Sequence, residues 1–391
     1  MNIFSFIFFF SIIVVIYGYI AYPLILMLIN FLTNGKKDKL DVESLADLPE
    51  VTIIIPAYNE AEYLEEKILN TISLNYESAK KAIIVITDGS DDHSKSVIEK
   101  FPNVIYMHKD QRKGKFAAMK RAIDCVTTPI TIFTDANAIL NEEAILNMVR
   151  HYNDINVGAV AGEKRVAQNP SVISSASCES IYWKYESFLK KLDAEFNSVI
   201  GAAGELFSIR TSLFEDIGEN IVLDDFMLTL KINLKGFKTE YEPNAFAMES
   251  ASANIVEEHE RKVRISAGGY QSIILLMKDK KLFRYPKLVF QLLSRRIMRW
   301  MIAPILLPII LIANLILVNF ETLEYIVLLL FQILFYLFAF FGFRSVNKKG
   351  VSKLFKIPFY FTFMHISALL GMVRFLKGNQ SVSWKKVKRL N

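Results

Sequence analysis

Charged residues are absent from one long stretch at the start of the chain. It runs from Ile3 to Phe31, which is longer than the roughly 20 residues that a helix needs to cross the hydrocarbon core of a bilayer. No basic residue precedes this stretch, and no small-residue cleavage site is evident, as a secretory signal would require. We therefore predict a retained transmembrane helix within residues 1–35.

Long apolar segments return after residue 280. Pro286–Trp300 has basic and apolar residues on opposite helical faces, which is typical of a helix on a membrane surface or of the basic flank of the next span. Ile302–Phe320 and Tyr325–Phe343 are uncharged and each long enough to cross, while the shorter Ile357–Val373 either crosses or lies in the interface. The predicted regions are an amphipathic interface helix over residues 281–300, two or three spans over residues 301–376, and a basic tail over residues 377–391.

Between residues 48 and 280, short β-branched runs alternate with longer amphipathic segments. Strands that alternate with helices in this way predict a mainly parallel, doubly wound α/β sheet. The expected strands are Val51–Pro56, Ala82–Asp88, Val104–His108, Pro129–Asp135 and, more weakly, Gly158–Ala161. The expected helices are Glu60–Ser73, Asp92–Lys100, Lys115–Cys125 and Glu142–Tyr152.

The composition agrees with a chain that lies partly in lipid. Of 391 residues 52% are hydrophobic, and the mean hydropathy is +0.28, which is high for a soluble protein. Two cysteines exclude a disulfide scaffold and a zinc cluster of cysteine type. A net charge of +6 in a membrane protein more often marks the flanks of spans than nucleic-acid binding, and we expect no nucleic-acid partner.

The positions of the basic residues predict the orientation of the chain. Lysines follow the first span, and a basic link separates the last two apolar segments, whereas the link that holds Glu321 and Glu324 has neither Lys nor Arg. Because basic residues favour the cytoplasmic side, we predict that the middle domain is cytoplasmic and the glutamate link external. The basic tail favours the cytoplasm, yet a fourth crossing would put it outside, so the side of the C-terminus stays open. The basic positions are Lys36, Lys37 and Lys39 after the first span, and Arg344, Lys348, Lys349, Lys353 and Lys356 in the later link.

Polar side chains follow three of the predicted strands at their carboxyl ends, where open parallel sheets bind their ligands. The chain has neither GxGxxG after the first strand nor GxxxxGK[ST], which argues against a dinucleotide dehydrogenase and a P-loop NTPase. Carboxylates at strand ends suit a nucleotide together with a divalent metal ion. The three segments are Pro56-Ala57-Tyr58-Asn59-Glu60, Asp88-Gly89-Ser90-Asp91-Asp92 and Thr134-Asp135-Ala136-Asn137.

Five residues carry most of the candidate chemistry. Asp135 and Asn137 are two residues apart, so their side chains point the same way from an extended segment, and their oxygens suit Mg²⁺ or Mn²⁺; both are also ordinary turn residues. Lys115 begins a predicted helix, where it either faces a diphosphate or is simply solvated. Asp224 and Asp225 begin another helix, which they either cap or provide with a general base.

A run of charged residues extends from Glu257 to Arg264. Such a run is typical of a solvated helix. The functional alternative is that Arg264 holds a phosphate group, for which the planar guanidinium is well suited.

In this order, the motifs resemble glycosyltransferase family 2, and more closely its membrane-embedded branch, which includes the synthases of hyaluronan, cellulose and poly-N-acetylglucosamine. The resemblance covers about residues 48–270 and the flanking spans. It implies an α/β GT-A domain, with a doubly wound mixed sheet and flanking transmembrane helices, on the cytoplasmic face of the cell (inner or plasma) membrane. It also implies inverting transfer of a hexose or N-acetylhexosamine from a nucleotide sugar, usually a UDP-sugar.

The resemblance implies roles for matching residues. Asp225, in a Leu-Asp-Asp element where the family has Thr-Glu-Asp, would be the catalytic base. Asp135 would begin the Asp-x-Asp element that binds Mg²⁺ or Mn²⁺, with Asn137 in place of the second acid. The residues on the nucleotide or donor side would be Pro56, Tyr58, Asn59, Glu60, Asp88, Lys115, Asp135 and Arg264. The residues on the acceptor side would be Gly204, Glu205 and Asp224.

One element departs from the family pattern. Its Gln-x-x-Arg-Trp motif reads Arg261-Lys262-Val263-Arg264-Ile265 in this sequence, so the arginine is retained and the tryptophan is replaced. In the family that tryptophan supports the acceptor sugar, and Ile265 has no flat aromatic face. We therefore expect one or a few sugars to be added per encounter, unless another aromatic residue such as Trp183 or Tyr185 supplies the platform.

The residues and the resemblance together predict a membrane-bound inverting glycosyltransferase that acts in surface polysaccharide or glycoconjugate synthesis. It would transfer a sugar from a UDP-sugar to a hydroxyl group of a saccharide or lipid-linked saccharide. One alternative is transfer to a polyprenyl-phosphate carrier, against which the N-terminal span counts. The other is an inactive transferase-like scaffold or export partner, against which the retained Asp88, Asp135 and Asp225 count.

Overall fold

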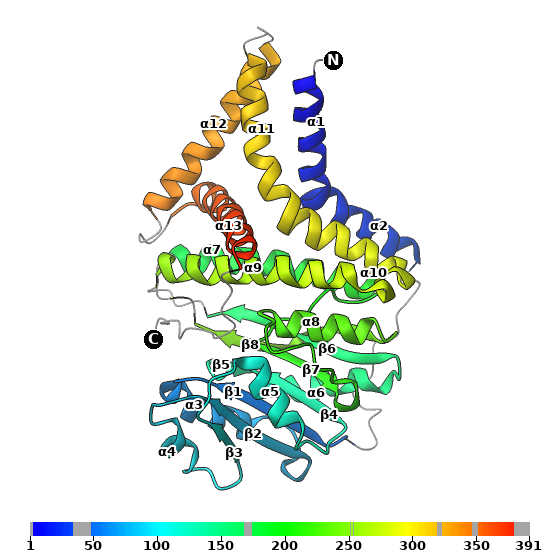
Figure 1. Ribbon diagram of the computed structural model, residues 1–391, viewed down its shortest axis with the longest axis vertical. Helices are drawn as coiled ribbons and strands as arrows, with labels where there is room; N and C mark the ends of the chain where they lie inside the picture. Colours follow the sequence, from blue (N-terminus) through cyan, green and yellow to red (C-terminus); the bar gives the residue numbers. More distant parts are fainter. Residues whose placement is uncertain are drawn as a thin grey trace. The chain divides into compact units, whose positions relative to one another are not determined.

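The computed structural model describes residues 3–33, 48–167, 174–250, 252, 254–318, 323–345 and 351–378, with the backbone alone for residues 174–178. Two compact units are present (Figure 1). The first, the helical unit, contains the described residues of 1–31, 168–182 and 252–380. The second, the sheet unit, contains the described residues of 32–167 and 183–251.

One mixed sheet forms the sheet unit, with the strand order β3-β2-β1-β4-β7-β6-β8-β5. Neighbouring strands from β3 to β4 run parallel, β7 runs antiparallel to both of its neighbours, β6 and β8 run parallel, and β5 pairs antiparallel with β8. The mixed GT-A type of sheet implied by the resemblance is confirmed. The strands are β1 Val51–Ala57, β2 Lys81–Asp88, β3 Ile105–Lys109, β4 Ile130–Thr134, β5 Ala138–Leu140, β6 Val157–Val166, β7 Leu206–Arg210 and β8 Lys238–Glu249.

Helices cover both faces of this sheet because successive residues of a strand point to opposite faces. Ile53 and Ile55 of β1 join a core with helices on one face, and Ile54 joins a second core with helices on the other. The helices of the first face are α3 Ala61–Ser73, α4 Ser94–Ile98 and α6 Ala144–Val149. Those of the second face are α5 Lys115–Ile123 and α8 Asp224–Asn233, with the C-terminal part of α7 Ser174–Phe196. The doubly wound arrangement predicted from the sequence is therefore confirmed.

Strands β5, β7 and β8 were not predicted, and they are the ones that make the sheet mixed. β5 and β7 have three and five residues, too few for a clear alternating pattern. β8 contains Pro243, and its pairing with β6 shifts register after Gly162. Proline cannot donate to a ladder and is found at such irregularities, so the period of the strand is interrupted in the sequence.

Within the described residues, four helical segments are long and apolar enough to cross a membrane. The predicted interface helix and the following span form one continuous helical segment, Pro286–Val318, and the shorter predicted segment is extended to Lys353–Leu376. How these segments divide into interface and spanning regions stays a prediction. The elements are α1 Ile3–Ile16, the π-helical η1 Tyr17–Ala21, α2 Tyr22–Thr33, α9 Ile255–Lys278, α10 Pro286–Gln291, the π-helical η7 Leu292–Ile302, α11 Ala303–Val318, α12 Leu323–Arg344 and α13 Lys353–Leu376.

Contacts within the helical unit are close and partly polar. Helix α1 packs on α11, and α13 packs on both α9 and α12. Gly371 of α13 lies so near α9 that an added Cβ would be 2.6 Å from the Cβ of Ser266, so glycine permits this approach.

Several residues used to predict the orientation lie outside the described residues: Lys36, Lys37, Lys39, Glu321, Lys348, Lys349 and the tail after residue 378.

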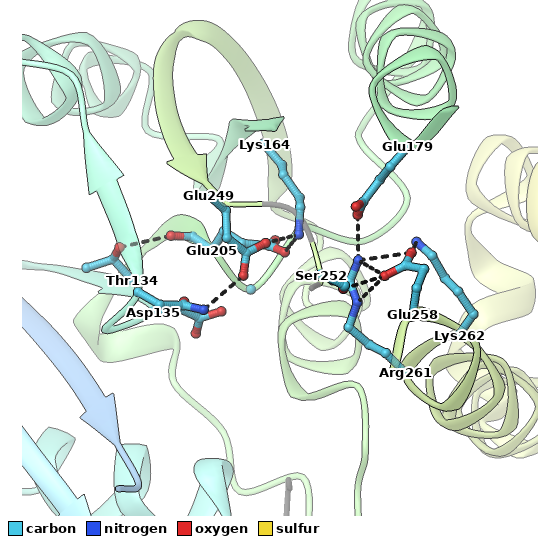
Figure 2. Close-up of polar contacts among 12 residues, drawn as sticks. Thr134, Asp135, Lys164, Glu179, Glu205, Glu249, Ser252, Glu258, Arg261 and Lys262 are labelled. Carbon is cyan, nitrogen blue, oxygen red and sulfur yellow. Dashed lines mark hydrogen bonds and ion pairs between the residues drawn. The ribbon is translucent and has the colours of Figure 1, made fainter. Parts of the chain in front are cut away.

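The charged run of Glu257–Arg264 is not a solvated helix face, so that expectation is wrong. Glu258 and Lys262 are each 3% exposed, and Arg261 forms ion pairs with Glu258 at 2.9 Å and with Glu179 of α7 (Figure 2). Ser252 and Tyr360 also donate hydrogen bonds to Glu258. Burial alone would raise the pKa of Glu258, but Arg261 and Lys262 hold it well below its ordinary value. The run therefore ties α9 to α7 and α13.

Replacement of Arg261 by methionine is expected to lower the stability by about 3–5 kcal/mol, because it leaves two buried carboxylates with too little positive charge. Thermal unfolding of the full chain in detergent measures the effect. Lys100→Met is the matched control, since Lys100 and Glu65 form an ion pair on exposed side chains and such pairs contribute at most about 1 kcal/mol. Equal unfolding midpoints for the two variants would contradict the structural role of Arg261.

Candidate active site

Two loops at the carboxyl ends of β1 and β2 are joined by hydrogen bonds. Asn59 has a φ of 53°, a left-handed conformation that asparagine tolerates better than most residues. Its side chain donates to Asp91 at 2.6 Å and accepts from the Asp91 amide at 3.0 Å. The neighbouring Tyr58 ring lies 3.6 Å from the Arg112 guanidinium. The residues predicted to bind the nucleotide therefore lie in one fixed loop pair, next to Pro56 of β1 and to Glu60, which precedes α3.

Asp88 ends β2 and is 1% exposed. One of its oxygens accepts hydrogen bonds from the backbone amides of Lys113 at 2.9 Å and Gly114 at 2.6 Å, and the other accepts from Arg121 at 3.0 Å. Asp88 therefore fixes the loop before α5 and, through it, the position of Lys115. Direct contact of Asp88 with a donor stays a prediction.

Residues from four distant segments meet beside the end of β4. Lys115 Nζ donates to Asp135 Oδ1 at 2.5 Å and to the Gly204 carbonyl at 3.4 Å. A Cβ added to Gly204 would lie 3.0 Å from Lys115 Nζ and 3.4 Å from Asp225 Oδ2. The structure therefore brings together Lys115, Asp135, Gly204 and Asp225, and Gly204 keeps the space between the lysine and the carboxylate open.

Asp224 and Asp225 form the first turn of α8, and both alternatives left by the sequence have support. Asp224 Oδ1 accepts from the Asp225 amide at 3.0 Å, and Asp225 Oδ1 accepts from the Phe226 amide at 2.8 Å, so both residues satisfy helix amides. Asp225 nevertheless keeps partial exposure. Asp224 is 6% exposed, and its Oδ2 is buried with no hydrogen-bond partner in the described parts of the chain, which is uncommon for a carboxylate oxygen.

The carboxylates of this site disfavour one another's charge. Burial and the charge of Asp224 raise the pKa of Asp225 to about 7, against the opposing effect of Lys115. Burial raises the pKa of Asp135 too, and nearby glutamates add to the effect while Lys115 opposes it. Burial alone would lower the pKa of Lys115, but Asp135, Asp224 and Asp225 raise it well above its ordinary value. Lys115 therefore stays protonated, and Asp225 can gain or lose a proton near neutral pH.

A second polar cluster, not predicted from the sequence, lies on the same unit (Figure 2). Lys164 of β6 is 2% exposed and forms ion pairs with Glu205 and Glu249. Asn137 donates to Glu249 at 3.2 Å, and Thr134 donates to the Glu205 carbonyl at 2.9 Å. Asn137 therefore already has a carboxylate partner within the protein, and Glu205, predicted on the acceptor side, is held by a lysine.

Lys67 is a third lysine near the end of β4, in addition to Lys115 and Lys164. It is fully buried on α3 and donates to Thr134 Oγ1 at 2.9 Å and to the Ala138 carbonyl. Burial lowers its pKa to about 7, with the charge of Asp135 acting in the opposite direction. A lysine on the otherwise apolar face of an amphipathic helix was the available sequence signal for this residue.

The residues present fit a divalent cation that arrives with a diphosphate. Five carboxylates face three lysines here, and one of the lysines has a pKa near 7. Among the residues with described side chains, no three carboxylate, histidine or cysteine groups could hold a metal ion by themselves. One carboxylate plus substrate phosphates is the usual way in which Mg²⁺ is held in nucleotide sites, and Asp135 can be that carboxylate.

Comparison with known proteins identifies the sheet unit. The family model "Glycosyl transferase family 2" matches residues 52–218, which begin in β1 and include the segments of Asp88, Asp135 and Gly204. Curated relatives extend the similarity along the chain. The sheet unit is a family 2 glycosyltransferase domain. The protein is therefore an enzyme with a glycosyltransferase domain of this family and, with four long apolar helical segments in its described part, a membrane protein.

Two of these relatives cover about three quarters of the glycosyltransferase. The poly-beta-1,6-N-acetyl-D-glucosamine synthase of Staphylococcus aureus (strain COL) is 25% identical over 307 residues, 75% of this chain and 73% of its own. The synthase of the same name from Staphylococcus epidermidis is 24% identical over 309 residues, with the same coverage. The similarity therefore includes helices outside the sheet unit, in agreement with the membrane-embedded branch of the family.

A solved structure has the same fold as the glycosyltransferase. It is the mannosyltransferase PcManGT from Pyrobaculum calidifontis in complex with GDP-Man and Mn²⁺, with a TM-score of 0.73 and 20% identity. The match covers 96% of this chain and 100% of that chain. At this identity the likeness concerns the fold alone.

One predicted residue of the glycosyltransferase site lies in the other unit. Arg264 is on α9 of the helical unit and is partly buried there. Its predicted contact with the donor diphosphate stays a prediction. All of the other predicted site residues lie in the sheet unit, and the contacts above join Lys115, Asp135, Gly204, Glu205, Asp224 and Asp225.

Proposed function

We propose that this enzyme transfers N-acetylglucosamine from its UDP-sugar, with inversion, to a hydroxyl group of a growing surface saccharide or lipid-linked saccharide. The observation that carries the proposal is that Lys115, Asp135 and Asp225 meet at the carboxyl end of the sheet. A cation therefore lies near a carboxylate that can bind a metal ion and a carboxylate that can act as a base. The names of the relatives support N-acetylglucosamine as the sugar.

Asp225 acts as the general base in this mechanism. Its carboxylate takes the proton of the acceptor hydroxyl, and the oxygen forms a bond to the anomeric carbon while the bond from that carbon to the diphosphate oxygen breaks. The nucleoside diphosphate leaves with the electron pair of that bond, from the face opposite to the attack. The raised pKa of Asp225, about 7, makes the carboxylate a stronger base than an ordinary aspartate.

Lys115 stabilises the negative charge of the leaving diphosphate, since it is fixed beside Asp135 and stays protonated. Mg²⁺ or Mn²⁺, held by Asp135 with help from the Asn137 side chain, would add positive charge at the same group. The loop pair of Tyr58 and Asn59 holds the nucleoside.

The donor is tested with the purified full-length enzyme in detergent and a panel of UDP-sugars, with release of UDP as the readout. UDP-N-acetylglucosamine is expected to give the fastest release. No UDP release from any UDP-sugar, with Mg²⁺ and Mn²⁺ both present, would contradict the proposal. Faster release from another UDP-sugar would correct the sugar and keep the reaction.

The glycosyltransferase domain is proposed to be cytoplasmic. The basic residues that flank the spans lie on the same side of the membrane as this domain, and basic residues favour the cytoplasmic side. A cysteine at Glu324 should therefore react with an impermeant thiol reagent added to intact cells, and a cysteine at Ser352 should react only after permeabilisation. Both are placed in a chain in which Cys125 and Cys178 are serine, so that no other thiol is labelled. The opposite pattern would reverse the orientation.

A further inference from the structure

An aromatic side chain lies at the far end of the Lys164 cluster. Trp183 of α7 keeps part of its surface exposed, and Lys164 Nζ lies 5.1 Å from the centroid of its ring. The lysine is itself fixed by Glu205 and Glu249. A cation–π contact with a buried ammonium group stabilises the position of an indole ring. Trp183 is therefore a partly exposed aromatic surface that contacts a buried lysine.

This surface is connected to the catalytic base through neighbouring residues. Lys164 holds Glu205, and Glu205 follows Gly204, which lies beside Lys115 and Asp225. The charge of Glu205 is also one of the causes that raise the pKa of Asp225. Trp183, Glu205 and Asp225 thus belong to one continuous part of the sheet unit.

The exposed fraction of the side chains increases from one end of the cluster to the other, which leaves one end accessible to a ligand. The side chains of Lys164 and Glu249 are 1% and 3% exposed, whereas that of Glu205 is 14% exposed, and Trp183 is partly exposed. Lys164 and Glu249 form the buried part of the cluster. The Trp183 ring and the Glu205 carboxylate keep the exposed surface that a ligand can contact.

A ring and a carboxylate in this arrangement match the chemistry of a pyranose. Such a sugar has a face of C–H groups that packs on a flat aromatic surface, and hydroxyl groups at its edge that donate to a carboxylate. We propose that Trp183 and Glu205 form the subsite for the terminal sugar of the acceptor, with Lys164 as a positioning residue. The proposal rests on the proposed function, and Trp183 supplies the platform that Ile265 cannot.

The consequence concerns the length of the product. The replacement of tryptophan by Ile265 suggests release of the acceptor after one or a few transfers. With Trp183 as the platform, the acceptor is held beside Asp225 while the donor side refills. The structure therefore points to the alternative that the sequence left open, in which a different aromatic residue retains the growing end.

Binding and turnover are measured separately in the test. Saturation-transfer NMR gives the affinity of the full-length enzyme, in detergent with UDP and Mn²⁺, for a short β-1,6-linked N-acetylglucosamine oligosaccharide. Transfer from UDP-N-acetylglucosamine to the same oligosaccharide gives the acceptor KM, and UDP release without acceptor gives the donor KM. The variants are Trp183→Ala, Trp183→Phe and, as a control, Phe188→Ala, which removes an aromatic residue of the same helix that is 41% exposed.

Trp183→Ala is expected to weaken oligosaccharide binding and raise the acceptor KM roughly tenfold, the size of an aromatic stacking contribution. Trp183→Phe should recover most of the loss, and Phe188→Ala should match the wild type. The donor KM should change less than about twofold in all three, which a general loss of structure would not allow.

Unchanged oligosaccharide binding in Trp183→Ala would overturn the subsite, and so would a wild type that does not bind the oligosaccharide. An equal rise of donor and acceptor KM would also overturn it, because the residue would then be structural. A wild type that binds the oligosaccharide but releases no UDP would contradict the proposed function alone, and the binding comparison of the variants would still decide the role of Trp183.

Discussion

Replacement of Asp225 by asparagine is expected to reduce sugar transfer by roughly 10²–10⁴-fold, the usual contribution of a general base. The amide has the same shape but cannot take the acceptor proton. Donor binding should be retained, because Lys115 and Asp135 keep their mutual contact. Transfer is measured with purified enzyme, and donor affinity by titration with UDP-N-acetylglucosamine. Activity above a few per cent of wild type would remove Asp225 from this role.

Asp224→Asn is the matched control for this variant. Asp224 is the neighbouring carboxylate of the same helical turn and accepts a backbone hydrogen bond, so its replacement should have a milder effect on transfer. It should also lower the pKa of Asp225, since the charge of Asp224 is one cause of the elevation. The pH at which kcat/KM reaches half of its maximum should therefore fall below the wild-type value.

The pH profile follows from the protonation of the base. In the wild type, kcat/KM should rise with pH and reach half of its maximum near pH 7, because burial and Asp224 raise the pKa of Asp225 to about 7. A base is active when deprotonated, so activity is lost as the pH falls through that value. A profile with no inflection between pH 5 and pH 9 would contradict the assignment.

The unfolding temperature of the Asp225→Asn variant distinguishes a loss of catalysis from a folding defect. The pKa of Asp225 is raised from 3.8 to about 7 in the folded protein, so its contribution to stability is full below the lower value and is lost as the pH rises through the upper one. Asparagine does not titrate. At pH 8 the Asp225→Asn variant should therefore unfold at the same temperature as the wild type or higher, although it is inactive.

The sequence allows the half of the candidate site that lies at strand ends to be located. Tyr58, Asn59, Asp88 and Asp135 follow strands whose apolar runs are clear, and the carboxyl ends of parallel strands meet at one edge. Their approximate positions could therefore be placed before the structure was known. The sequence does not indicate the hydrogen-bond partners of these side chains. An example is Asp88, whose carboxylate accepts hydrogen bonds from two backbone amides.

The other half of the site depends on strands that the sequence does not reveal. Glu205 immediately precedes β7, and Glu249 ends β8, whose pattern is broken at Pro243. Lys164 is a buried lysine of β6, and a lysine in a strand ordinarily indicates the exposed face. Only the pairing of these strands brings the three charges together. For the same reason, burial of Glu258 and Arg261 became evident only when α7, α9 and α13 were seen to pack.

Removal of the metal ion should abolish transfer, and Mn²⁺ or Mg²⁺ should restore it. Without a divalent cation, a donor diphosphate would enter a site in which five carboxylates already face three lysines. Asp135→Ala should have the same effect as chelation, a loss of at least about 10²-fold in kcat/KM, because it removes the carboxylate proposed to hold the cation and the partner of Lys115. Full activity in excess EDTA would contradict a metal-dependent reaction.

One further variant separates the charge of Asp135 from its hydrogen bond, and another tests residue 137. Asp135→Asn keeps an acceptor for Lys115 but loses the charge, so the concentration of Mn²⁺ required for half-maximal activity should rise steeply. Asn137→Asp adds an acid at the second position of the metal element and should lower that concentration. Asn137 donates a hydrogen bond to Glu249, and an aspartate there would instead place two carboxylates together. This variant should therefore unfold at a lower temperature in EDTA and recover with Mn²⁺ and UDP. A variant that is equally stable with and without the ion would show that residue 137 does not contact it.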